Sequence, residues 1–248
     1  MNLGVLMNYY RNDPRCLQIA NGIVLPQPQH FQISGTYGSA AQFILASVFE
    51  NTSTPQNHLV ILNEGEDAAY FHNSLQNITG ALEIFYFPST FKNKKNFSLV
   101  NSSHVMLRTE ALTKIAAGGN KKILITHADA LFEKVVLSKT LFEKTLHIKQ
   151  ADELDVDLLI EKCVNYGFEK TDFVYEPGQF AIRGGIIDIY SFGNEKPYRI
   201  ELFGKEVDSI RIFDPETQLS ERKLLQVNII PNIDTQFQST EKVSLLEF

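Results

Sequence analysis

Strand-like and helix-like patterns alternate through the first 137 residues of this 248-residue chain. Short apolar runs, typical of buried strands, are separated by segments whose apolar residues recur at helical spacing. Such alternation is typical of parallel strands connected by helices, so the sequence predicts an α/β domain over residues 1–137. The run 58–63 is continuously apolar, which predicts a strand buried on both faces. The predicted strands are residues 30–34, 58–63, 83–88 and 121–127, and the predicted helices are residues 40–50, 66–78 and 102–117.

The pattern changes after residue 137. One helix is predicted over residues 152–167, with Asp152 near its N-cap and Gly167 just past its end. Alternating apolar and polar residues follow, separated by turns that are too short for a crossover helix, and these favour an antiparallel meander. They predict a smaller α+β domain with an antiparallel sheet over residues 138–223. We interpret residues 224–248 as the truncated start of a further domain.

The charge balance limits the partners that the chain can bind. It has 23 Lys and Arg against 29 Asp and Glu, a net charge of −6. A protein that binds nucleic acid over its whole surface should be basic, so we expect little direct DNA binding. The apolar runs are far shorter than the roughly 20 residues of a membrane span. Without a membrane span or a secretory leader, we expect a cytoplasmic protein, with Cys16 and Cys163 as buried thiols.

Residues 34–40 lie where a phosphate-binding loop would lie, between a predicted strand and a predicted helix. Gly35 and Gly38 could bring backbone amides close to a phosphate, and Ser39 precedes the helix. A working loop also needs a lysine for the β- and γ-phosphates, and none follows Gly38. We therefore interpret the loop as degenerate. A glycine turn that starts the helix explains these residues, and residual anion binding at the helix N-terminus is the alternative.

Metal and catalytic motifs are missing from the sequence. The six histidines are scattered, and no Cys-x-x-Cys, His-Glu-x-x-His or Gly-x-Ser-x-Gly spacing occurs. We therefore expect no metal site, no cofactor and no catalytic residue in this chain.

One face of the predicted meander combines an aromatic residue with two arginines. On strand 198–203 the even positions are apolar, so Arg199 and Phe203 are predicted on the opposite, wetter face. The same parity turns Arg183 outward on strand 179–183. An outward aromatic beside arginines is typical of a protein-binding surface. The alternative is that the domain's own helix covers Phe203 and that both arginines are merely solvated.

The meander also resembles a sequence signature shared by UvrB and the bacterial transcription-repair coupling factors. The matching stretches are YEPGQFAIRGGIIDIY (175–190), PYRIELFGKEVDSIR (197–211) and FDPETQ (213–218), and a weaker match runs from residue 34 to 136. UvrB carries an intact phosphate-binding loop and a long tyrosine-rich hairpin. This chain lacks the lysine, and its corresponding stretch, residues 85–103, is short. Both losses are typical of the UvrB-like module of the coupling factors.

The resemblance implies a function. It makes residues 1–137 domain 1a, a helicase-like nucleotide-binding fold that has degenerated, residues 138–223 domain 2, and residues 224–248 the start of domain 1b. Domain 2 of both families recruits UvrA, and the contact residues fall on Arg183, Arg199 and Phe203. The polymerase-binding domain and the ATP-dependent DNA translocase of the family would act in cis. This chain would be a non-catalytic docking module between stalled RNA polymerase and nucleotide excision repair. The alternatives are UvrB or a divergent relative, and a weak free-standing nucleotide-binding domain.

Overall fold

The computed structural model describes residues 2–80, 83–90, 102–119, 121–233 and 242–247. The chain divides into two compact units, which we call the first and the second unit. The first unit comprises residues 1–88 and 118–130, and the second comprises residues 89–117 and 131–248. The predicted domains, residues 1–137, 138–223 and 224–248, stay a prediction.

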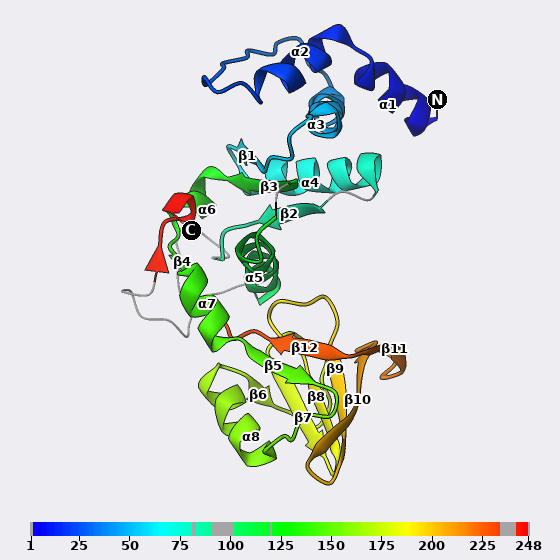
Figure 1. The fold of residues 1–248 in the computed structure, drawn as a ribbon, viewed down its shortest axis with the longest axis vertical. Helices are drawn as coiled ribbons and strands as arrows, with labels where there is room; N and C mark the ends of the chain where they lie inside the picture. The colour runs from blue at the N-terminus through cyan, green and yellow to red at the C-terminus, as the bar shows by residue number, and fades with distance from the viewer. Residues whose placement is uncertain (1, 81–82, 91–101, 120, 234–241, 248) are drawn as a thin grey trace. The chain divides into compact units, whose positions relative to one another are not determined.

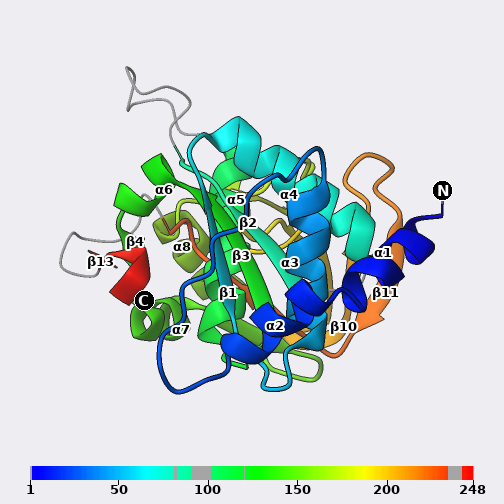
Figure 2. The same ribbon diagram turned by 90° about the horizontal axis from the view of Figure 1, so that it is seen from above.

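The first unit is built on a three-stranded parallel sheet in the order β1-β3-β2 (Figures 1 and 2). Gly80, with a positive φ of 65°, ends the helix that connects β1 to β2, as its lack of a side chain allows. The α/β class is confirmed. The strands are β1 (His58–Leu62), β2 (Glu83–Phe87) and β3 (Lys122–His127), and the helices are α1 (Leu3–Arg11), α2 (Pro14–Gly22), α3 (Ala40–Asn51), α4 (Gly65–Thr79) and the start of α6 (Ala128–Phe132).

The core of the first unit lies between the sheet and its helices. Helix α4 packs on all three strands, and α3 packs on α4 and also on α1 and α2 (Figure 1). The most buried of the side chains that meet there form one stripe on each helix and one face of the sheet. They include Phe43 and Phe49 of α3, Leu75 of α4, and Ile123 and Ile125 of β3.

The predicted strand at residues 30–34 is wrong. These residues adopt no regular structure and pair with no strand. The ring of Phe31 instead packs on Gly22 at the end of α2, where a Cβ atom would lie 2.4 Å from the ring. Ile33 lies near Ile19 of α2 and Ile44 of α3. The Phe31 ring therefore packs on a helix while Ile33 stays 50% exposed, although the alternation of the segment is typical of a strand.

The prediction that strand 58–63 is buried on both faces is also wrong. The side chains of Val60 and Leu62 pack into the core of the first unit, but Leu59 is 42% exposed and Ile61 is 53% exposed. Strand β1 is the end strand of the sheet, and the helices of this unit pack on its other face. A continuous apolar run therefore indicated a strand correctly but did not show that both faces are covered.

The second unit contains a six-stranded sheet in the order β11-β10-β9-β8-β7-β6. All pairs are antiparallel except β6 with β7, so the predicted meander is confirmed. Its strands are β6 (Glu169–Lys170), β7 (Gln179–Arg183), β8 (Ile186–Ile189), β9 (Tyr198–Phe203), β10 (Glu206–Phe213) and β11 (Ser220–Leu224). The remaining elements are α5 (Ser102–Ala116), β4 (Val135–Val136), α7 (Ser138–Lys144), β5 (Leu146–Lys149), α8 (Val156–Asn165), β12 (Gln226–Ile229), β13 (Lys242–Val243) and the 3₁₀ helix η2 (Leu245–Glu247).

The helix predicted from Asp152 begins four residues later. Asp155 is its N-cap, and the Asp155 carboxylate accepts a hydrogen bond from the Leu158 amide. Asp152 is engaged elsewhere, because its carboxylate accepts a hydrogen bond from the Lys149 amide and its carbonyl from the Val207 amide. Asp152 and Asp155 are both suited to cap a helix, so the sequence alone does not show which of them does. The hydrogen bond from the Val207 amide of β10 to the Asp152 carbonyl keeps Asp152 outside the helix.

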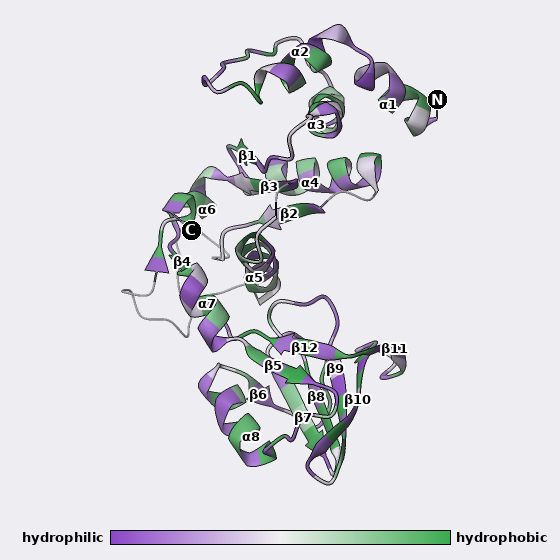
Figure 3. Ribbon diagram, viewed as in Figure 1, coloured by the Kyte–Doolittle hydropathy of each residue, from purple (hydrophilic) through white to green (hydrophobic). Residues whose placement is uncertain are grey.

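The two faces of the six-stranded sheet differ. One face presents Ile187, Ile200 and Ile210 side by side on β8, β9 and β10, all fully or almost fully buried. The other face is covered at one end by a small apolar cluster that includes Tyr190 and Phe213. Toward its opposite end this second face is more exposed and carries Phe203 together with polar residues. Hydrophobic and hydrophilic residues accordingly share the strands of this sheet in Figure 3.

Candidate functional site

Phe203 is the outstanding exposed side chain of the six-stranded sheet. It is the last residue of β9, and its side chain is 84% exposed, whereas Ile200 on the other face is fully buried. The tight turn at Gly204, with a φ of 66°, leads directly into β10. The predicted parity of β9 is therefore confirmed. The alternative, in which the domain's own helix covers Phe203, is not observed in the described residues.

Arg183 and Arg199 lie on the same face, and both bind the buried carboxylate of Asp188. Asp188 lies directly opposite Arg199 in the sheet, on the neighbouring strand β8. Arg199 donates from Nε to Oδ1 at 2.7 Å and from Nη2 to Oδ2 at 2.9 Å. Arg183 donates from Nη2 to the same Oδ2. The arginines are therefore not simply solvated but are held as a pair by one carboxylate.

A backbone carbonyl accepts a further hydrogen bond from each guanidinium group. Arg183 Nη1 donates to the Asp172 carbonyl at 2.6 Å, and Arg199 Nη1 donates to the Gln218 carbonyl at 3.0 Å. Hydrogen bonding to Asp188 raises the pKa of Arg199 above its usual value, although burial acts in the opposite direction. Two guanidinium groups against one carboxylate leave this cluster with a net charge of about +1 at neutral pH.

Aromatic rings support both arginines. The guanidinium carbon of Arg199 lies 4.4 Å from the centre of the Phe213 ring, and that of Arg183 lies 4.9 Å from the centre of the Phe173 ring. Phe173 is itself 48% exposed, so it adds aromatic surface beside Arg183. Sequence reasoning missed Phe173 and the part played by Asp188. The polar position of Asp188 among apolar neighbours on β8 was the signal that could have found it.

Arg183, Arg199 and Phe203 lie on one face of the sheet, but their side chains do not form a continuous row. Arg199 and Phe203 are four residues apart on β9, which is about 13 Å at roughly 3.3 Å per residue. Glu201 lies between them on the same face, where it accepts a hydrogen bond from Ser209 at 2.6 Å and pairs with Arg211 at 3.2 Å. The face around Phe203 thus presents an exposed aromatic and two arginines, with an acidic residue that is already paired. We call it the Phe203 face.

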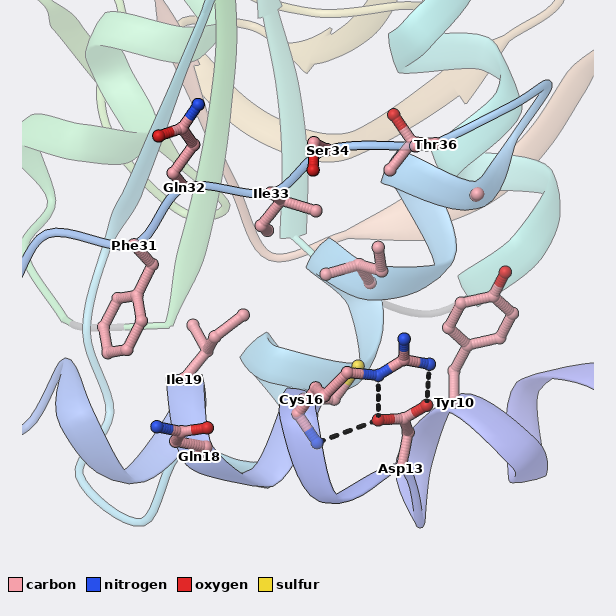
Figure 4. Close-up of a pocket in the computed structure, with 14 residues that line it drawn as sticks. Tyr10, Asp13, Cys16, Gln18, Ile19, Phe31, Gln32, Ile33, Ser34 and Thr36 are labelled. Atoms are coloured by element: carbon pink, nitrogen blue, oxygen red, sulfur yellow. Dashed lines mark hydrogen bonds and ion pairs between the residues drawn. The ribbon is translucent and has the colours of Figure 1, made fainter.

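The degenerate loop lies at a cavity of about 430 Å³ in the first unit (Figure 4). Gly35 and Gly38 have φ angles of 74° and 55°, and Ser39 precedes α3 without a side-chain hydrogen bond to the helix. Arg15 is the sole Lys or Arg among the described residues that line the cavity, and it is paired with Asp13, as the dashed lines in Figure 4 mark. This lining offers no uncompensated cation for a phosphate.

Other kinds of site find no support within the described residues. Both cysteines are buried and free, and burial raises the pKa of Cys163 to about 12. No cluster of three or more His, Cys, Asp or Glu side chains in the described part could hold a metal ion. No helix within residues 2–247, the masked stretches aside, is both long and apolar enough to cross a membrane.

Part of the second unit matches a known protein family. Residues 146–234, which include the whole Phe203 face, match the family model of the UvrB interaction domain. A transcription-repair-coupling factor of Staphylococcus aureus (strain bovine RF122 / ET3-1) is 30% identical over 197 residues, 79% of this chain. The chain is a relative of the transcription-repair coupling factors.

A second coupling factor, from Bacillus subtilis (strain 168), is 26% identical over 215 residues, or 87% of this chain. The similarity to the coupling factors therefore extends from the second unit into the first. The chain spans only 16% of the length of the S. aureus coupling factor and 18% of that from B. subtilis.

Proposed function

We propose that the chain is a docking module that binds UvrA through the Phe203 face. Its role would be to link RNA polymerase stalled at DNA damage to nucleotide excision repair. The membership of residues 146–234 in the UvrB interaction domain family and the similarity to coupling factors support this role. The polymerase-binding and translocase domains of the coupling factors would act in cis, and this chain would contribute recruitment without catalysis.

The observation that carries the proposal is the 84% exposure of Phe203 on the sheet face that also carries two fixed arginines. Burying a phenylalanine ring removes a large apolar area from water, and such rings dominate the free energy of many interfaces. Arginines that are already oriented lose little conformational entropy when a partner binds. A partner surface with an apolar pocket and neighbouring carboxylates would fit this face.

The first unit is proposed to be a scaffold. The glycines of its degenerate loop remain, but no lysine follows them, and the segment before the loop is not a strand of the sheet. A phosphate-binding loop normally connects a central strand to its helix, so both the cation and the anchoring strand are missing from residues 30–39.

The test is the affinity of the full chain for UvrA, measured by a direct binding assay such as calorimetry. Phe203→Ala should weaken binding by roughly thirtyfold or more, because truncation of a central anchor costs about 2 kcal/mol or more. Phe132→Ala is the matched control, since Phe132 lies in the same unit and is 88% exposed, but belongs to α6 and not to the six-stranded sheet. Equal affinities of the two variants and the unmodified chain would contradict the proposal.

A further inference from the structure

Asp188 is a completely buried acidic residue bound to the two arginines of the Phe203 face. Its side chain has no exposed surface, yet it carries a carboxylate. Burying a charge is costly unless the charge is paired and hydrogen-bonded. Three hydrogen bonds from two arginines satisfy it here, and those arginines come from the two strands that flank β8.

The geometry restricts both arginines. Arg199 meets the carboxylate as a two-pronged fork, with its guanidinium group also resting on the Phe213 ring. Arg183 meets the same oxygen Oδ2 through one nitrogen only, and Phe173 supports its guanidinium group from the side. Without the shared carboxylate, the two guanidinium groups would lie near each other with like charges and no anchor between them.

We propose that Asp188 is a positioning residue for UvrA recognition, which fixes Arg183 and Arg199 as a preorganised pair without contacting UvrA itself. This inference rests on the proposed function. Each arginine has a long side chain that would otherwise sample many rotamers, and ordering such side chains on binding costs free energy. The buried carboxylate orders the two arginines when the chain folds. Their conformational entropy is therefore already lost before an acidic partner surface binds.

Binding to UvrA at different salt concentrations separates this role from a purely structural one. Asp188→Asn keeps the shape of the side chain but removes its charge. We expect it to weaken binding by about tenfold at low salt, because charge-assisted hydrogen bonds fix the arginines. Removing the carboxylate also raises the charge of the cluster from about +1 to about +2, which favours an acidic partner at low salt, so the loss should grow at high salt, where this attraction is screened. Phe203→Ala is the comparison, and its apolar loss should be similar at all salt concentrations.

These measurements test the role of Asp188 separately from the proposed binding of UvrA. A folded Asp188→Asn variant that binds within twofold of the unmodified chain would overturn the inference, as would an equal loss at every salt concentration. If Asp188→Asn does not fold, Arg199→Lys decides, because a lysine keeps the charge but loses the fork to Asp188. It should show a similar loss of affinity, and binding like the unmodified chain would overturn the inference. If the unmodified chain does not bind UvrA at all, the proposed function itself fails.

Discussion

Removing Arg199 should strongly destabilise the second unit, because it leaves a buried charge with one partner. Asp188 is completely buried and accepts three hydrogen bonds, two of them from Arg199. Hydrogen bonds to charged groups each contribute about 1.5–3 kcal/mol, and removing one partner of a buried ion pair costs about 3–5 kcal/mol. Because Arg183 stays in contact, we expect Arg199→Ala to lower the free energy of unfolding by about 3 kcal/mol.

The assay is urea denaturation followed by circular dichroism, with two further variants. Adding Asp188→Asn to Arg199→Ala should restore part of the stability, since a neutral amide is cheaper to bury than a carboxylate. Arg15→Ala is the matched control. Arg15 also donates two hydrogen bonds to one carboxylate, that of Asp13, but its side chain is 87% exposed. It should change stability little. The reasoning is refuted if Arg199→Ala is as stable as Arg15→Ala, or if the double variant is less stable than Arg199→Ala.

Three further predictions concern the core, a thiol and nucleotide. Ile200→Ala should lower the free energy of unfolding by about 2–4 kcal/mol in urea, because the side chain is fully buried; a loss below about 1 kcal/mol would show that the site is not close-packed. Cys163 has a pKa raised to about 12 by burial, so its favourable contribution to stability should be complete below the usual thiol pKa near 9 and decline as the pH rises toward 12; rapid reaction with a thiol reagent at pH 8 in the native state would contradict this. Millimolar ATP should leave the melting temperature unchanged, since the loop at Gly35 and Gly38 has no lysine, and a concentration-dependent rise would contradict the scaffold proposal.

The sequence predicted best those elements whose patterns are decided locally. The meander was predictable because polar and apolar residues alternate strictly on β9 and the turns between strands are too short to cross over. Gly167 lies just past the end of its helix as predicted, with a positive φ angle that glycine adopts without strain. These features depend on neighbouring residues alone, so a single sequence contains them.

What the sequence could not predict depends on partners that are distant in the chain. Residues 30–34 alternate like a strand, but the Phe31 ring packs on Gly22 of α2 and Ile33 stays 50% exposed. Leu59 and Ile61 are exposed because α4 packs on the other face of β1, and the run itself does not show which faces of a strand are covered. The pairing of Asp188 with both arginines likewise appears only once β7, β8 and β9 are in register.

The most direct test of the Phe203 face is photo-crosslinking of the full chain to UvrA. A photoreactive phenylalanine analogue replaces either Phe203 or Phe132, two aromatic residues of similar exposure, 84% and 88%. We predict a covalent adduct with UvrA from the analogue that replaces Phe203 and none from the analogue that replaces Phe132. A crosslink to UvrA from the Phe132 site alone would place the contact elsewhere on the chain and contradict the account.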